Sequence, residues 1–214
     1  MITRYGYTTV GIITLICVII MLVSIYIKNN YLSFPLVLIG ISIFTFTLYF
    51  FRDPDRIPPP LENIIVSPAD GEVIIIKELK NNKFIDEKCR QISIFMSPLS
   101  VHVNRIPISG KIEYLNYHEG EYLVAFHDKA DERNERNEIG IESKYGKVFF
   151  TQVAGAMARR IVSELNQGQE VIIGERFGMI KFGSRADVIV PVKWNLKVRI
   201  GDKVTAGETI LYDL

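Results

Sequence analysis

The chain has 214 residues, and 48% of them carry hydrophobic side chains, which suffices for one membrane-anchoring segment and one domain of ordinary size. Its 25 basic and 24 acidic residues leave a net charge of +1, so no one-signed field indicates a nucleic acid or another polyanion as a partner. The two cysteines, Cys17 and Cys89, have neither metal-ligand nor redox spacing. We therefore expect no disulfide framework and a reducing compartment.

The first 51 residues form a hydrophobic region that is nearly free of charge. Only Arg4 and Lys28 are charged before position 52. Two uncharged runs, 10–27 and 34–51, are each 18 residues long, close to the roughly 20 residues that span a hydrocarbon core. They predict a membrane-anchoring helical hairpin over residues 1–51, which either crosses the bilayer or is partly embedded in it.

The charges around this hairpin predict its orientation. Arg4, Arg52 and Arg56 flank its outer ends. Lys28 alone lies in the connection, so the positive-inside tendency places both ends in the cytoplasm. A cleaved signal peptide is not expected, because no small-residue cleavage site follows the first run and a second apolar run does. Segment 52–60 is rich in proline and predicts a stiff linker that ends the helical region.

Residues 61–214 have the pattern of a β-rich domain. Short runs of Val, Ile, Phe and Tyr alternate with Asp-Gly, Gly-Lys and Gly-Asp steps, which predicts an antiparallel sheet or barrel. Segment 158–167 (ARRIVSELNQ) has apolar residues at helical spacing and predicts a helix, whereas the highly charged segment 129–138 (KADERNERNE) predicts a solvated loop. The expected fold class is mainly β (α+β): a barrel-sandwich-like domain with one or two short helices, preceded by the N-terminal apolar helical hairpin.

The closing segment 196–210 (LKVRIGDKVTAGETI) resembles the strand-turn-strand unit of lipoyl- and biotinyl-type carrier domains. It lacks the modified lysine at the hairpin tip, so the architecture can be shared without the carrier function. A non-catalytic, membrane-tethered carrier-like binding domain is therefore one interpretation of the chain. It predicts an intact polypeptide without a reactive ketone.

Few residues follow an obvious catalytic pattern. The chain has no Gly-x-Ser-x-Gly elbow, Walker loop, dinucleotide fingerprint or His-Glu-x-x-His motif. Its three histidines, His102, His118 and His127, are not spaced as metal ligands, and no metal site is predicted. His102 is the best candidate among them, because Pro98 and Pro107 bracket a short apolar stretch that would fix its orientation. Asp70, taken alone, indicates a turn, because it lies between Ala69 and Gly71 after a proline.

The Gly183–Ser184 step interrupts two apolar runs in GMIKFGSRADVIVPV, residues 178–192. Gly183 allows backbone conformations closed to other residues, so its carbonyl can be twisted and exposed beside the Ser184 hydroxyl. Attack by that hydroxyl would convert the amide to an ester, and removal of the Ser184 α-proton would eliminate the ester and leave a dehydroalanine that hydrolyses to a pyruvoyl group. Taken alone, such a step more often indicates a bulge or a turn.

Several motifs occur in a fixed order along the chain. They are FFRDPDR, SPADG, SPLSVHVNRIP, DKADERNERN, VAGAMARRI, GERFGMIKFGSR and the closing turn. From about residue 50 to residue 214 the chain resembles the phosphatidylserine decarboxylase proenzymes, in their short form. Larger members have Leu-Gly-Ser-Thr where this chain has Phe-Gly-Ser-Arg, a difference that keeps the two reacting residues.

The resemblance implies that the chain cuts itself between Gly183 and Ser184 into a large chain, 1–183, and a small chain, 184–214, which remain associated. Ser184 would become a covalent pyruvoyl cofactor, an electron sink comparable to pyridoxal phosphate. The implied reaction converts phosphatidylserine to phosphatidylethanolamine, and the same chemistry on an archaeal ether serine lipid is an alternative. The expected partners are the serine phospholipid, the membrane and a second copy of the chain, with the catalytic domain on the cytoplasmic side of the cell membrane.

The resemblance also implies roles for individual residues. Asp70 matches the acidic residue that acts with a histidine in self-cleavage, and His102 matches the histidine of the second motif, to which we assign proton transfer in decarboxylation. Arg105 stands where longer bacterial members carry a second histidine, and an arginine does not readily act as a base.

This departure leaves the base for self-cleavage open. Either His102 serves both steps or Asp70 acts directly. Alternatively, His118 or His127 supplies the missing imidazole. Arg105 and Arg136 are candidates for binding the lipid phosphate, with a structural ion pair as the alternative for each.

Overall fold

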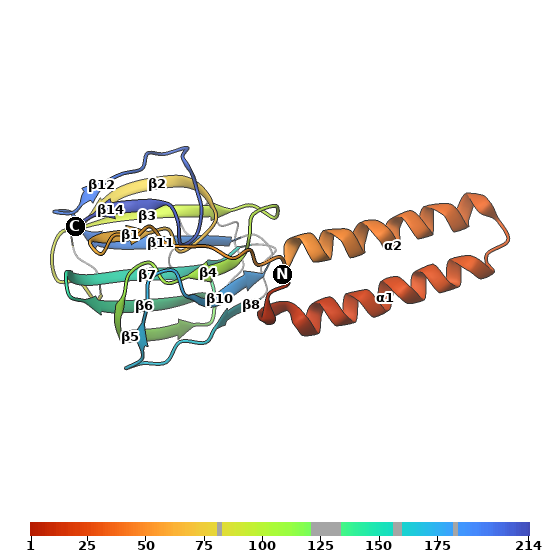
Figure 1. The fold of residues 1–214 in the computed structure, drawn as a ribbon, viewed down its shortest axis with the longest axis horizontal. Coiled ribbons are helices and arrows are strands. Elements are labelled where there is room, and N and C mark those ends of the chain that lie inside the picture. Colours follow the sequence, from red (N-terminus) through yellow and green to blue (C-terminus); the bar gives the residue numbers. More distant parts are fainter. Residues whose placement is uncertain (81–82, 121–133, 156–159, 182–183) are drawn as a thin grey trace. The chain divides into compact units, whose positions relative to one another are not determined.

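The computed structural model describes residues 1–80, 83–120, 134–155, 160–181 and 184–214. The chain divides into two compact units, Met1–Pro54 and Asp55–Leu214. The first is helical and the second is built from strands (Figure 1). None of the residues described between 55 and 214 is helical.

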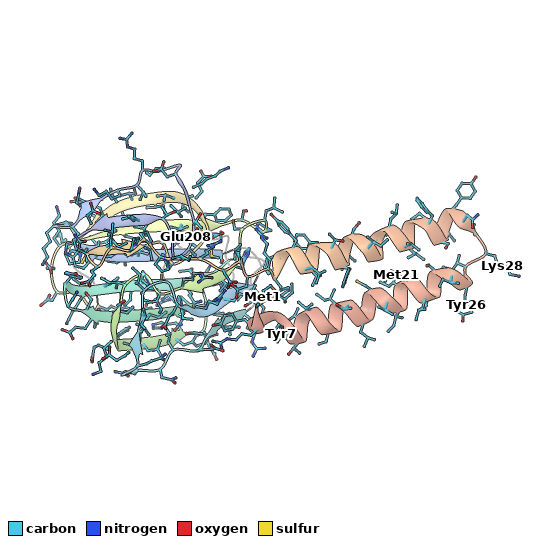
Figure 2. All side chains as sticks on the ribbon, in the orientation of Figure 1. Met1, Tyr7, Met21, Tyr26, Lys28 and Glu208 are labelled. Carbon is cyan, nitrogen blue, oxygen red and sulfur yellow. The ribbon has the colours of Figure 1, made fainter. Side chains whose placement is uncertain are left out.

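Two long apolar helices fill the first unit. A short 3-10 helix, η1 (Arg4–Gly6), leads into α1 (Tyr7–Tyr26), and α2 spans Asn30–Phe50. At 1.5 Å per residue, a helix of this length extends about 30 Å, which matches a hydrocarbon core. The mean hydropathies of the two segments are 2.7 and 1.9, and most of their side chains are exposed (Figure 2). By length and composition both helices can cross a membrane.

A glycine and a polar contact bring α1 and α2 together. A Cβ atom on Gly40 would lie 3.3 Å from Cγ of Met21, so the glycine lets α2 approach α1 closely at this point. Ser33 Oγ donates a hydrogen bond of 2.8 Å to the carbonyl oxygen of Ser24. The two apolar runs therefore form a packed hairpin.

The strands of the second unit are, in chain order, β1 (Ile64–Val66), β2 (Gly71–Leu79), β3 (Cys89–Met96), β4 (Val103–Arg105), β5 (Gly110–His118), β6 (Arg136–Ser143), β7 (Gly146–Ala154), β8 (Arg160–Ser163), β9 (Glu170–Val171), β10 (Arg176–Lys181), β11 (Ser184–Pro191), β12 (Asn195–Leu196), β13 (Lys203–Val204) and β14 (Ile210–Asp213).

These strands form one large and two small antiparallel sheets. The large sheet has the order β13-β2-β3-β11-β7-β6-β5-β9, and the small sheets have the orders β4-β10-β8 and β1-β14-β12. One face of the large sheet packs on the small sheets around a common apolar core, in which the rings of Phe150 and Phe177 meet edge to face at 5.5 Å. The curled large sheet is visible in Figure 1. The structure confirms a mainly β, sandwich-like domain that follows an apolar hairpin.

The Gly183–Ser184 step lies where the chain passes from one sheet to another. β10 ends at Lys181 in a small sheet, and β11 begins at Ser184 between β3 and β7 in the large sheet. Gly183 itself lies outside the described residues. The interruption between the two apolar runs therefore marks a change of sheet.

The helix predicted over 158–167 is wrong in the part that the structure describes. Residues 160–163 form β8, which pairs with β10 so that Ile161 lies opposite Ile180. Residues 164–167 are not helical either. The β-branched pair at 161 and 162 suits a strand as well as a helical turn, and pairing with β10 decides between them.

The solvated loop predicted over 129–138 is also wrong at its end. Residues 129–133 lie outside the described part of the chain, but Arg136 begins β6, and Glu138 within it is only 4% exposed. The charge is tolerated there because cations and donors surround the carboxylate. Lys83 Nζ and Arg136 Nε lie 3.0 and 2.9 Å from Oε1, and the Tyr114 hydroxyl and His118 Nε2 each lie 3.0 Å from Oε2.

This cluster controls the ionisation of Glu138. Burial alone would raise the pKa of its carboxyl, but the hydrogen bonds from Arg136, Lys83, His118 and Tyr114 outweigh burial and lower it to about 2. A carboxyl whose pKa is lower in the folded chain stabilises the fold above its unfolded-state pKa and loses that contribution as the pH falls. The cluster is therefore a stabilising element at neutral pH.

We expect Glu138→Gln to lower the free energy of unfolding by about 1–3 kcal/mol at pH 7, because the neutral amide loses the charge-assisted hydrogen bonds. The difference from the unmodified chain should shrink as the pH falls from 4.5 toward 2. Fluorescence of the single tryptophan, Trp194 in the core, reports urea unfolding in detergent. Glu62→Gln is the control, because Glu62 pairs with Lys144 on the surface and should contribute little. Equal effects of the two substitutions would contradict the expectation.

Candidate active site

Ser184 begins β11 in the middle of the large sheet. It pairs with Met96 of β3 on one side and with Ala154 of β7 on the other. The residue is 0% exposed, and its hydroxyl donates a hydrogen bond of 3.2 Å to Sδ of Met96. A thioether is a weak acceptor, so this hydroxyl is held in place without a strong competing bond.

A network of buried amides lies next to Ser184. Asn104 Nδ2 lies 3.8 Å from the same Sδ of Met96, so the serine and the asparagine share one acceptor. Gln152 Nε2 donates to Asn104 Oδ1 over 2.9 Å, and Asn137 Nδ2 donates to Gln152 Oε1 over 3.1 Å. All of these side chains are at least 95% buried. A satisfied network of this kind fixes the groups around Ser184 in one arrangement.

The loop before β4 fixes the imidazole of His102. Its Nδ1 lies 2.9 Å from the carbonyl oxygen of Ser100, and a carbonyl only accepts, so Nδ1 carries the proton in the neutral ring. Nε2 is then the basic nitrogen. The residue is fully buried, and its own carbonyl accepts a hydrogen bond of 3.4 Å from the Ile180 N–H. His102 is thus tied to the strand that leads directly to Ser184.

Asp70 precedes β2 and is held mainly by Arg56. The Arg56 guanidinium engages both carboxylate oxygens of Asp70, with Nη2 at 2.7 Å from Oδ2. The Ala206 N–H donates to Oδ1 over 2.8 Å, and Arg56 Nη1 donates to the Ala206 carbonyl over 3.0 Å. The bidentate geometry and the backbone bonds orient the Asp70 carboxylate tightly.

Backbone contacts join the Asp70 segment to the His102 segment. The carbonyl oxygen of Pro68 accepts hydrogen bonds from the Arg105 N–H at 2.9 Å and from Asn104 Nδ2 at 3.3 Å. Since Asn104 also approaches Met96, one chain of contacts runs from the SPADG motif through the VHVNR motif to Ser184. The structure therefore brings the segments of the three principal candidates together.

The strand register gathers these segments at one end of the large sheet, which we call the Ser184 end. Directly paired residues on neighbouring strands form a row there: Lys203, Glu72, Phe95, Arg185, Val153, Arg136 and His118. Ser184 belongs to the next row. A cavity of about 440 Å³ opens at the same end, with Asp70, Ser97 and Ser100 among its lining residues.

Arg105 and Arg136 both contact protein groups. Arg105 is 4% exposed, and its Nη1 donates to the Gly174 carbonyl over 2.9 Å. Arg136 donates to Glu138, as described above. These contacts favour the structural alternative over lipid binding for both arginines.

Of the two remaining histidines, the structure describes only His118. His118 contacts Glu138 and lies in the same row of paired residues as Arg185. Successive side chains of a strand point to opposite faces, so the side chains of Arg185 and Ser184 lie on opposite faces of the sheet. His118 is therefore on the face away from the Ser184 side chain. His127 lies outside the described residues. Of the two described histidines, His102 is the one whose backbone is bound to β10, the strand that precedes Ser184.

Sequence reasoning missed Arg56 and the amide network. The sequence shows Arg56 as a charge flanking the hairpin and as the last residue of the FFRDPDR motif, and an arginine in a proline-rich linker carries no local sign of a partner fourteen positions away. Asn104 and Gln152 did leave a signal, because each is an amide next to a valine in a β-type run, and amides are seldom fully buried without a specific partner.

Position 184 suits a pyruvoyl group formed in place. The site is buried, its neighbours Met96 and Ala154 are apolar, and the serine hydroxyl has only a weak acceptor. Within the described part of the chain, the hydroxyl's hydrogen-bond partner is the uncharged thioether of Met96, which need not move when the hydroxyl becomes a ketone. The residues present therefore fit the group.

Comparisons with known proteins identify the family of the chain. The family model for phosphatidylserine decarboxylase matches residues 43–212. The phosphatidylserine decarboxylase proenzyme of Chlorobium limicola is 45% identical over 99% of both chains. That of Chlorobium phaeobacteroides is 47% identical over 98% of both chains, and that of Salinibacter ruber is 49% identical over 83% of this chain and 79% of its own. The chain belongs to the phosphatidylserine decarboxylase family of enzymes.

Proposed function

We propose that this protein is a membrane-anchored proenzyme that cuts itself between Gly183 and Ser184 and then decarboxylates phosphatidylserine to phosphatidylethanolamine. The observation that carries the proposal is the setting of Ser184, a buried and weakly held hydroxyl at the joint between two sheets, beside the strand bound to His102. The names of the relatives support a serine phospholipid as the substrate.

The proposed self-cleavage uses only groups of the chain and one water. Ser184 Oγ bonds to the Gly183 carbonyl carbon as the peptide C–N bond breaks, and the hydroxyl proton passes to the released amine. A base then removes the α-proton of residue 184, and the Gly183 carboxylate leaves. The dehydroalanine takes up water and loses ammonia, which leaves the pyruvoyl group at the start of the small chain.

We assign the proton transfers to His102. Its Nδ1–H is committed to Ser100, so Nε2 is the nitrogen that can accept and return a proton. Asp70, oriented by Arg56, is the acidic partner in self-cleavage. In the second reaction the pyruvoyl group would bind the substrate amine and accept the electron pair left by carbon dioxide. His102 would then return a proton to the carbon that lost carbon dioxide.

The two chains are expected to stay together after the cut. The small chain supplies β11, which pairs with β3 and β7 of the large chain, and also β13 and β14, which pair with β2 and β1. Separating them would expose buried apolar strands on both partners. The processed enzyme is therefore a non-covalent complex in the proposal.

The apolar hairpin is proposed to hold the catalytic unit at the cytoplasmic side of the cell membrane. Anchoring keeps the enzyme on the surface that carries its substrate and raises the chance of productive encounter. Association with a second copy is also part of the proposal, because the outer edges of a sheet carry backbone groups that can pair with another chain. An ether-linked serine lipid would present the same headgroup, and comparing diacyl and dialkyl serine lipids in one assay distinguishes the substrates.

The intact mass of the purified protein tests the cleavage. We expect two fragments that meet at residues 183 and 184, the smaller one blocked by a pyruvoyl group, and a single uncut chain for Ser184→Ala. Ser143→Ala is the matched control, because Ser143 bonds to Gly146 in a distant hairpin and should not affect the cut. An uncut unmodified chain would favour the carrier-like alternative.

Arg56→Gln is expected to slow self-cleavage about tenfold or more, because Asp70 loses its bidentate partner. Arg56→Lys should restore part of the rate, since it keeps the charge but not the fork. Arg176→Gln is the control, because it breaks a pair with another linker carboxylate, the exposed Asp55. Electrophoresis of chains sampled after synthesis gives the rates, and equal rates for the Arg56→Gln and Arg176→Gln chains would refute the role of Arg56.

His102→Gln is expected to slow self-cleavage by about 10²–10⁴, the usual contribution of a general base. His118→Gln should leave the rate unchanged, because that imidazole contacts Glu138 on the other face of the sheet. Both variants are followed by intact mass over time. A His102→Gln chain that cuts normally but releases no carbon dioxide would show that another group is the base for the cut.

A further inference from the structure

The orientation of the Asn104 side-chain amide is determined by its partners. The Pro68 carbonyl oxygen lies 3.3 Å from Nδ2 and can only accept, so this end of the amide is the nitrogen. At the other end, Oδ1 accepts a hydrogen bond of 2.9 Å from Gln152 Nε2, which also lies 3.5 Å from the Val162 carbonyl oxygen. The N–H groups of Asn104 are therefore directed toward Pro68 and Met96.

One of these N–H groups is weakly engaged. The Pro68 carbonyl oxygen already accepts from the Arg105 N–H at 2.9 Å, and the other acceptor near Asn104 Nδ2 is the Met96 thioether at 3.8 Å. A thioether is a weak acceptor, and Asn104 is fully buried. A buried amide that donates to sulfur can transfer that hydrogen bond at little cost to an oxygen that gains charge.

The hydroxyl oxygen of Ser184 lies beside the same sulfur atom. Oγ is 3.2 Å from Sδ of Met96, so Oγ and Asn104 Nδ2 are about 5 Å apart if their directions from the sulfur form a right angle. A change of rotamer moves a serine oxygen by about 2 Å, which brings it to hydrogen-bond distance when the movement is toward Asn104. Both side chains are 0% exposed, so the contact would form away from bulk water.

The proposed self-cleavage reverses the hydrogen-bonding role of this oxygen. As a hydroxyl, Ser184 Oγ donates to Met96 Sδ. Once Oγ has bonded to the Gly183 carbonyl carbon, it is an ester oxygen without a hydrogen and can only accept. When the base removes the α-proton, the Cβ–Oγ bond breaks and its electron pair stays on Oγ, which leaves as part of the Gly183 carboxylate. A donor that meets this charge lowers the barrier to elimination.

We propose that Asn104 Nδ2 donates a hydrogen bond to the departing Ser184 oxygen, which makes Asn104 a catalytic residue of the elimination step. The inference rests on the proposed function. The α-proton goes to the base, while Asn104 keeps its own protons and stabilises the charge on the oxygen. Met96 is the shared acceptor until the ester forms, and the Gln152 amide keeps the Asn104 nitrogen turned toward the reaction.

Asn104→Leu tests this role in the full chain in detergent. The variant should form the ester and then complete the cut about 10²–10³ times more slowly, the usual effect of removing one donor to a developing oxyanion. Hydroxylamine attacks an ester much faster than an amide. It should therefore split the waiting chain into one fragment that ends in a hydroxamate at residue 183 and one that begins with an unblocked serine at residue 184. Intact mass distinguishes that serine from a pyruvoyl group.

Asn137→Leu is the matched control, because Asn137 is also buried and donates to Gln152 over 3.1 Å at the far end of the same network. Any uncut chain of this variant should resist hydroxylamine, since the donor beside Ser184 is kept. Equal sensitivity of the two variants would overturn the inference. An Asn104→Leu chain that cuts at the normal rate, or that stays uncut and resistant, would also overturn it.

Asn104→Val is the second variant, because a β-branched side chain suits a strand, and it decides the matter if Asn104→Leu does not fold. It should show the same slow cut and the same sensitivity to hydroxylamine. An unmodified chain that is neither cut nor sensitive to hydroxylamine would refute the proposed function itself.

Discussion

Backbone pairing of β11 with β3 and β7 is the constraint on which the rest of the site depends. It fixes Ser184 at the end of a fully buried strand, between Met96 and Ala154, while the preceding residues belong to another sheet. The chain therefore changes sheets between Lys181 and Ser184, the interval that contains the peptide bond broken in the proposed chemistry. Cutting the Gly183–Ser184 bond is expected to cost little stability, because β10 and β11 each keep the hydrogen bonds to their own neighbouring strands. The fold can thus hold the joint firmly before the reaction and both products afterwards.

A second constraint comes from the linker that follows the hairpin. Arg56 binds Asp70 and the Ala206 carbonyl, and Ala206 in turn binds Asp70, so three distant segments meet at one carboxylate. The prolines around Arg56 restrict the linker, which lowers the entropy lost when the arginine is held there. The segment that the sequence presents as a spacer therefore also forms part of the proposed site.

The sequence predicted the parts of this molecule that depend on local patterns. Two uncharged runs predicted the helices, alternation and turn residues predicted the sheets, and the motif order identified the family. Prediction failed where pairing between distant segments decides. Residues 160–163 are a strand because β10 lies beside them, and Glu138 is buried because Lys83, Tyr114 and His118 converge on it from other places in the chain. The contact between Arg56 and Asp70 is of the same kind.

Arg105 contributes to the geometry of the proposed site rather than to its proton transfers. Its N–H binds the Pro68 carbonyl, and its guanidinium binds the Gly174 carbonyl, so it joins the SPADG segment to the loop before β10. An imidazole at this position could titrate, whereas the guanidinium only donates. Arg105 therefore braces two neighbouring segments and does not act as a base. With His118 engaged by Glu138 on the other face of the sheet, His102 is the imidazole on which the proposed chemistry of the described site converges.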